Sequence, residues 1–135
     1  MNVNAGAGGQ YLMEVDEMPH RLLSVVVVDD TEPFRRIIGR ALESYGYDVA
    51  EAATEQEMWH LVGASRPDAV VLDWYLPDSD PATRFERLLG SGIPVVVVTG
   101  DPDGVPACTG DRVAVLGKPI HLDDLRRTLE SVLGL

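Results

Sequence analysis

The chain reads SVVVVDD at residues 24–30, four consecutive valines followed by two aspartates. A short run that is β-branched and apolar at every position is typical of a strand buried on both faces of a parallel sheet. Residues 69–72, 95–98 and 113–116 have the same apolar character, and a more polar run at residues 47–50 suits an edge strand. Together the five runs predict a five-stranded parallel sheet.

Amphipathic stretches follow the first, second, third and fifth runs, with apolar residues at spacings of three and four, and predict helices. Residues typical of helix starts and stops bound these stretches: Thr31, Thr54 with Glu57, Gly46 and Gly90. Strands that alternate with helices imply an α/β fold, in which helices cover both faces of a doubly wound sheet.

Two segments differ from this alternation. Residues 101–111 read DPDGVPACTGD, with two prolines, two glycines and no apolar stripe. We expect a loop there with at most one helical turn, so that the fourth helix of the fold is short or absent. Residues 1–20 show no periodicity and predict a flexible N-terminal tail, which leaves residues 21–135 as the folded domain.

The composition limits the range of partners. The 135 residues include 11 Lys and Arg against 22 Asp and Glu, a formal net charge of −11. This argues against direct nucleic-acid binding, which requires clustered basic side chains. No apolar run approaches the roughly 18 residues of a membrane helix. Because Glu14, Asp16 and Glu17 lie where a signal peptide would be apolar, we expect a cytoplasmic protein without a membrane partner.

Polar residues follow four of the apolar runs. Asp29 and Asp30 follow the first, Asp73 the third and Thr99 the fourth, and Lys118 comes two residues after the fifth. Ligands of open parallel sheets bind beyond the carboxyl ends of the strands, so we expect these side chains to converge. Neighbouring carboxylates repel, and Mg²⁺ suits oxygen ligands that leave room for water and phosphate. One carboxylate would then attack phosphorus while the hydroxyl and the ammonium stabilise the transferred charge.

This ordered set of residues resembles the receiver domain of the response regulators of two-component signal transduction. The resemblance covers residues 22–135, and the segment DWYLPDSD at residues 73–80 also looks like the loop that follows the family's phosphoacceptor. It implies the flavodoxin-like strand order 2-1-3-4-5.

The resemblance also implies roles for the acidic residues. Asp73 would accept a phosphoryl group from a phosphohistidine on a sensor histidine kinase or a histidine phosphotransfer protein. Asp30, Asp73 and the main-chain carbonyl of Tyr75 would bind Mg²⁺ directly, and Asp29 would act through water.

Thr99 and Lys118 would contact the phosphoryl group, and Pro119 would follow a cis peptide bond. Two positions depart from the family pattern: Pro81 stands where a glycine is usual, and Val115 stands where an aromatic switch residue is usual. These departures leave the path of signal propagation open. The output would be docking to an unknown downstream protein or an onward phosphorelay, and a homodimer stays open.

Two alternatives compete with the signalling switch. The unusual segment 101–111 leaves room for a receiver-like binding module that is not phosphorylated. A phosphatase of the haloacid dehalogenase class needs a second aspartate two residues after the first, where this chain has Thr31 or Glu32.

Because the chain ends just after the last predicted helix, we expect no DNA-binding or catalytic output domain. We expect no catalysis beyond the domain's own phosphorylation and dephosphorylation.

Overall fold

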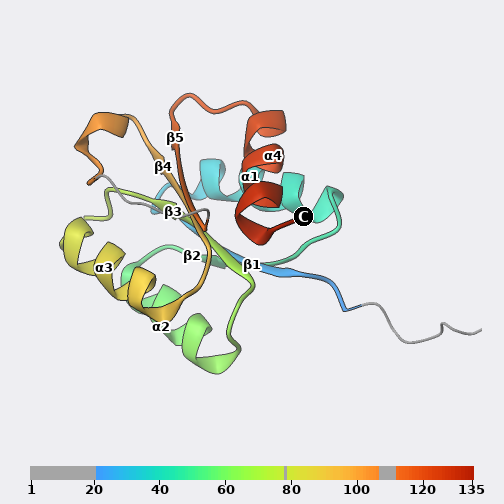
Figure 1. The fold of residues 1–135 in the computed structure, drawn as a ribbon, viewed down its shortest axis with the longest axis horizontal. Helices are drawn as coiled ribbons and strands as arrows, with labels where there is room; N and C mark the ends of the chain where they lie inside the picture. Colours follow the sequence, from blue (N-terminus) through green and yellow to red (C-terminus); the bar gives the residue numbers. More distant parts are fainter. Residues whose placement is uncertain (1–20, 78, 107–111) are drawn as a thin grey trace, which may run out of the picture.

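The computed structural model describes residues 21–77, 79–106 and 112–135, and within them strands and helices alternate along the chain (Figure 1). All strand pairs are parallel, and the sheet order is β2-β1-β3-β4-β5. The predicted doubly wound, flavodoxin-like α/β fold is therefore confirmed. The elements are β1 (Ser24–Val28), α1 (Glu32–Ser44), β2 (Asp48–Ala52), α2 (Glu55–Ala64), β3 (Ala69–Asp73), α3 (Pro81–Ser91), β4 (Val95–Thr99), the 3-10 turn η2 (Pro102–Gly104), β5 (Val113–Gly117) and α4 (Leu122–Leu133).

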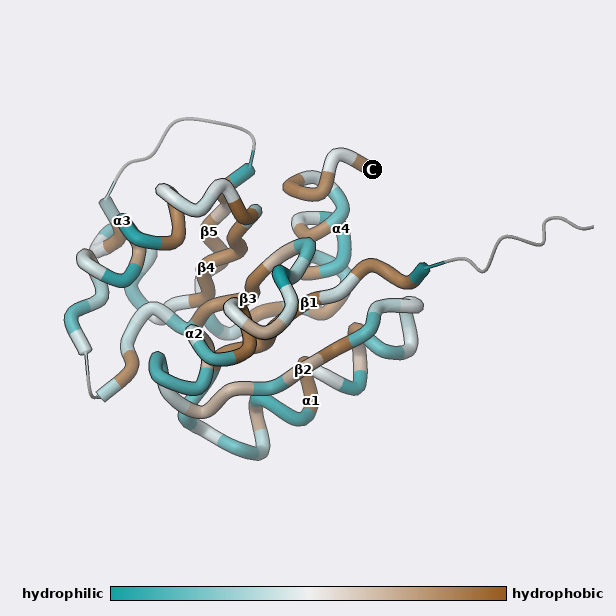
Figure 2. The backbone as a smooth tube through the Cα atoms, turned by 90° about the horizontal axis from the view of Figure 1, so that it is seen from below, coloured by the Kyte–Doolittle hydropathy of each residue, from teal (hydrophilic) through white to brown (hydrophobic). Residues whose placement is uncertain are grey.

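The helices form two layers, with α1 and α4 on one face of the sheet and α2 and α3 on the other (Figure 1). Side chains alternate between the faces of a strand, so each strand supplies both layers. In β1, Val25 and Val27 pack toward α1 and α4, whereas Val26 and Val28 pack toward α2 and α3. Figure 2 shows the hydrophobic strands in the middle of the molecule and hydrophilic turns of the helices outside.

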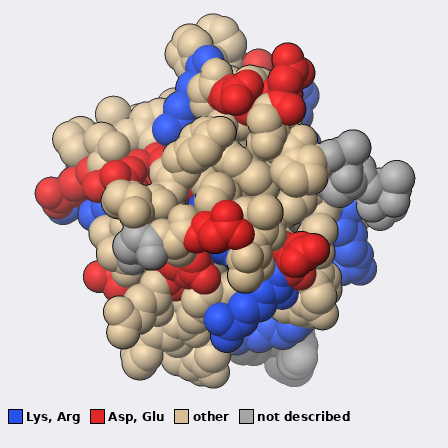
Figure 3. All heavy atoms as spheres, turned by 90° about the vertical axis from the view of Figure 1, so that its left-hand side faces the viewer, with Lys and Arg blue, Asp and Glu red and all other residues tan. Residues whose placement is uncertain are grey.

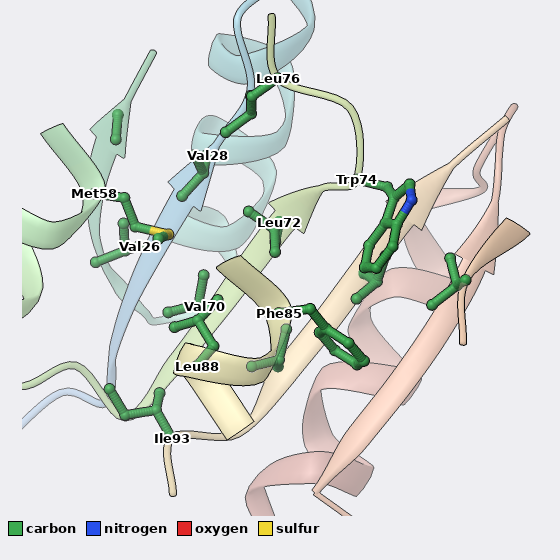
Figure 4. Close-up of a cluster of buried hydrophobic side chains, with 14 residues drawn as sticks. Val26, Val28, Met58, Val70, Leu72, Trp74, Leu76, Phe85, Leu88 and Ile93 are labelled. Atoms are coloured by element: carbon green, nitrogen blue, oxygen red, sulfur yellow. The ribbon is translucent and has the colours of Figure 1, made fainter. Parts of the chain in front are cut away.

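The core on the α2 and α3 side reaches up to the loop that follows β3. Figure 4 shows Leu72 of β3, Trp74 just after it and Phe85 and Leu88 of α3 within one apolar cluster. The rings of Trp74 and Phe85 meet edge to face, with centroids 5.3 Å apart. The residue after Asp73 is therefore part of the hydrophobic core and not of a free surface loop.

The two edge strands differ from the buried interior of the sheet. Every residue of β3 and β4 is buried, and β2 is a partly exposed edge strand as predicted. The prediction that the run at residues 113–116 is buried on both faces is wrong, because these residues of β5 are only half-buried. As an edge strand, β5 pairs with β4 alone, and in the described part of the segment between them the one regular element is the turn η2.

Helix boundaries follow the predicted signals with two exceptions. Thr54 caps α2 as predicted, its hydroxyl accepting from the Glu57 amide at 3.1 Å. Thr31 lies at the N-cap of α1, but its side chain makes no capping bond. Helix α3 continues through Gly90, and Gly92 ends it with a φ of 77°, in the left-handed region that glycine adopts without strain.

The predicted tail at residues 1–20 and residues 107–111 of the irregular segment lie outside the described residues. No helix in the described part of the chain has the length and apolar character needed to span a bilayer.

A pair of neighbouring leucines in α3 tests this packing. Leu88 is 0% exposed in the core and Leu89 is 39% exposed. Leu88→Ala leaves a cavity and is expected to lower the free energy of unfolding by about 2–5 kcal/mol. Leu89→Ala is the control, with an expected change of about 0.5 kcal/mol. Urea denaturation measures both, and equal effects of the two substitutions would contradict the packing described here.

Candidate functional site

Three carboxylates meet at the carboxyl edge of the sheet. Asp29 and Asp30 follow β1 and Asp73 ends β3, and these two strands are neighbours in the sheet. One oxygen from each side chain lies within 4.8 Å of the others. Asp29 and Asp73 are buried, whereas Asp30 is exposed. Figure 3 looks onto the side of the molecule toward which the strands run, and acidic side chains are visible near the centre of that face.

Lys118 brings a positive charge to this cluster from the far edge of the sheet. Its ammonium Nζ lies 3.5 Å from Asp73 Oδ1 and 3.8 Å from Asp29 Oδ2. The same ammonium lies 4.8 Å from the centre of the Phe34 ring, a favourable place for a cation. The Lys118–Pro119 peptide bond is cis, as the resemblance implied.

Thr99 lies beside Lys118 at the end of β4. Its main-chain carbonyl accepts from the Lys118 amide at 2.7 Å, and its side chain is fully buried. The Thr99 hydroxyl accepts a bond from the Asp101 amide at 3.0 Å, which leaves its own proton available to a further acceptor. The structure therefore places the hydroxyl at the same sheet edge as the carboxylates.

Burial raises the pKa of Asp73 above its ordinary value of 3.8. Lys118 opposes this rise, while the negative charges of Asp29 and Asp30 add to it. The folded protein therefore disfavours the ionised form of Asp73 when no cation other than Lys118 is near. Burial and the acidic neighbours together outweigh the single ammonium.

Asp29 is fixed on both of its oxygens. Oδ1 accepts from the Thr31 amide at 2.8 Å, and Oδ2 faces Lys118. Arg35 of α1 donates to the main-chain carbonyl of Asp29 at 2.8 Å and pairs with Glu51 of β2 at 3.0 Å. Arg35 thereby ties the β1–α1 loop to the neighbouring strand, a role that the sequence alone did not suggest.

The donor set fits a hard divalent cation. Carboxylate oxygens are the ligands that Mg²⁺ prefers, and a cation removes the repulsion among the three acids. Tyr75, the other expected ligand, follows Asp73 by two residues and is 54% exposed. That its main-chain carbonyl binds the cation remains a prediction.

A family model, the response regulator receiver domain, matches residues 25–130. The chain belongs to this family. The resemblance noted from the sequence is confirmed, and the haloacid dehalogenase alternative falls away.

Relatives and solved structures agree with this assignment. The receiver domain is 30% identical over 117 residues to the phosphate regulon transcriptional regulatory protein PhoB of Pseudomonas aeruginosa, covering 82% of this chain and 51% of that protein. It is 34% identical over 124 residues to the response regulator MprA of Mycolicibacterium vanbaalenii, covering 86% of this chain and 51% of that protein. The chain thus spans about half the length of the curated relatives it matches. The solution structure of the Erythrobacter litoralis PhyR response regulator receiver domain superposes with a TM-score of 0.73 at 24% identity, covering 84% of this chain and 92% of that one, which supports the fold.

Sequence reasoning missed one buried charged residue of the receiver domain. Arg84 of α3 is 1% exposed and lies under the loop that follows Asp73. A sequence pattern was available, because Arg84, Phe85 and Leu88 recur at the spacing of the buried face of a helix. A charged residue on such a face is rare enough to be noticed before the structure is known.

The raised pKa of Asp73 predicts a pH-dependent penalty on stability. A folded carboxyl with a raised pKa holds its proton more tightly than the unfolded one, so stability falls as pH rises from the ordinary value of 3.8 through the raised pKa. The penalty is complete once the pH exceeds the raised pKa. Without divalent cations, Asp73→Asn is therefore expected to raise the melting temperature at pH 7 by a few degrees.

Calorimetry from pH 7 downward measures this effect, and the difference between Asp73→Asn and the unsubstituted protein should narrow as pH approaches 3.8. Asp48→Asn, at an exposed position of β2, removes the same charge away from the site and serves as the control. A melting temperature that falls in Asp73→Asn at pH 7 would contradict the assigned electrostatics.

Proposed function

We propose that this receiver domain is a phosphorylation-dependent signalling switch, in which Asp73 accepts a phosphoryl group from a phosphohistidine with the help of Mg²⁺. One observation carries the proposal: the three carboxylates lie within 4.8 Å of one another, with Lys118 at 3.5 Å from Asp73. This arrangement combines a nucleophile, a set of cation ligands and a positive charge for the incoming group.

The reaction transfers the phosphoryl group from a ring nitrogen of histidine to a carboxylate oxygen of Asp73. The phosphorus–nitrogen bond breaks as the phosphorus–oxygen bond forms, and the imidazole leaves with its electron pair. Bound Mg²⁺ would supply charge neutralisation for the phosphoryl oxygens. Asp30, Asp73 and the carbonyl of Tyr75 would hold it directly, with Asp29 acting through water.

The remaining site residues would stabilise the product. Lys118 already faces Asp73, and it would pair with a phosphoryl oxygen once the group is attached. Thr99 can donate its hydroxyl proton, because the bond from the Asp101 amide uses a lone pair of the oxygen and not its O–H. Movement of this hydroxyl toward the phosphoryl group would be the first step of signal output.

We further propose a sensor histidine kinase or a histidine phosphotransfer protein as the donor, in the cytoplasm. An unknown downstream protein, or a further phosphorelay partner, would read the phosphorylated surface. Val115 of β5 is half-buried where an aromatic switch residue is usual in the family, so the output would not depend on an aromatic flip at that position. A homodimer remains compatible with this output.

Phosphorylation by a small donor tests the proposal. Incubation with acetyl phosphate and Mg²⁺ is expected to raise the intact mass by one phosphoryl group, and Asp73→Asn should abolish the increase. Asp48→Asn removes an exposed carboxylate at the amino end of β2, opposite the sheet edge that carries the cluster, and should be modified like the unsubstituted protein. An unchanged mass of the unsubstituted protein would favour the unphosphorylated binding module instead.

A further inference from the structure

Arg84 of α3 is a buried cation that bonds to three groups in two separate parts of the chain. One terminal nitrogen, Nη2, donates to the main-chain carbonyl of Trp74. The other, Nη1, donates to the hydroxyl of Ser79 and pairs with the carboxylate of Glu55 at 3.3 Å. The guanidinium thus links the loop after β3 to the start of α2.

Stability alone does not require an arginine at this position. The desolvation penalty of a buried ion pair often matches or exceeds its Coulombic gain, and well-packed apolar residues can replace such pairs without loss. Arg84 shares its helix face with Phe85 and Leu88, so an apolar side chain would meet apolar neighbours. Its polar contacts therefore point to a role other than filling the core.

The contact with Trp74 fixes the backbone next to the phosphoacceptor. The Trp74 amide donates to the Val98 carbonyl of β4 at 3.0 Å, and the Trp74 carbonyl accepts from Arg84. The buried Trp74 ring packs against Phe85. Amide, carbonyl and ring of one residue are thus all held, and this residue joins Asp73 to Tyr75.

Glu55 in turn orients the guanidinium. It is the first residue of α2, where the helix dipole favours an anion. Its second oxygen accepts from the Trp59 indole at 2.7 Å. Partial burial works against ionisation, but hydrogen bonds from Ser79, Trp59 and Arg84 prevail and hold the pKa of Glu55 below its ordinary value. Arg84 therefore faces a carboxylate that remains charged at neutral pH.

We propose that Arg84 is a positioning residue of the phosphorylation site, which holds the Trp74 carbonyl so that the Asp73 carboxylate and the Tyr75 carbonyl can bind one divalent cation together. The inference rests on the proposed function, since it assigns Arg84 a part in the same site. Arg84 acts only through the backbone that it fixes.

Methionine at position 84 separates this role from a merely structural one. Arg84→Met keeps the length of the side chain and removes its donors. Because the Trp74 carbonyl and Glu55 lose their donor, the variant should melt below the unsubstituted protein. While folded, it should bind Mg²⁺ about 10-fold or more weakly, the usual cost of removing a group that orients a metal ligand. A Mg²⁺ titration followed by tryptophan fluorescence measures the affinity, because Trp74 adjoins the site, and thermal melting measures stability.

Arg87→Met is the matched control on the same helix, where the guanidinium stacks 3.9 Å from the centre of the Trp59 ring. It should keep the Mg²⁺ affinity of the unsubstituted protein. If Arg84→Met does not fold, Arg84→Lys takes its place: it keeps the charge, but a lysine lacks the fork that bonds the Trp74 carbonyl and Glu55 together. A tenfold loss of Mg²⁺ affinity in the folded variant supports the inference.

Undiminished Mg²⁺ affinity in a folded Arg84 variant overturns the inference and leaves the proposed function intact. Failure of the proposed function has a different signature. In that case the unsubstituted protein itself neither binds Mg²⁺ nor gains a phosphoryl group, and the inference falls with it.

Discussion

The site depends on like charges that the fold forces together. One oxygen each of Asp29, Asp30 and Asp73 lies within 4.8 Å of the others, and Lys118 faces Asp29 and Asp73. Two unit charges about 4 Å apart repel by roughly 4 kcal/mol at an effective dielectric of 20. The rest of the domain supplies the stability that keeps these groups in place. In the proposed function, relief of this repulsion would favour binding of a divalent cation and, through it, of a phosphoryl group.

The parallel sheet is what makes this convergence possible. Because all five strands run in one direction, their carboxyl ends form one edge, and residues far apart in the sequence meet there. The central strands β3 and β4 are buried on both faces and leave Asp73 and Thr99 little freedom. Lys118 directly follows the half-buried edge strand β5, so the cation comes from an edge of the sheet and not from its buried centre.

The sequence predicts the strands and the acidic cluster well because each follows from a local pattern. A strand buried on both faces must be apolar at every position, and β1 (Ser24–Val28) has the predicted bounds. Burial that depends on distant partners is harder to predict. The exposure of β5 depends on which helix covers the sheet. The helical pattern places Arg84 on the buried face of α3, but its partners Glu55 and the Trp74 carbonyl come from segments whose proximity no local pattern shows.

A crystal structure of the protein with Mg²⁺ and beryllium trifluoride, a mimic of the phosphoryl group, tests the central claim most directly. We expect the beryllium trifluoride to be bound to a carboxylate oxygen of Asp73, facing Thr99 and Lys118. We expect the cation to be bound by Asp30, Asp73 and the Tyr75 carbonyl. A cation bound elsewhere, or beryllium trifluoride on another side chain, would contradict the claim that these residues form one phosphorylation site.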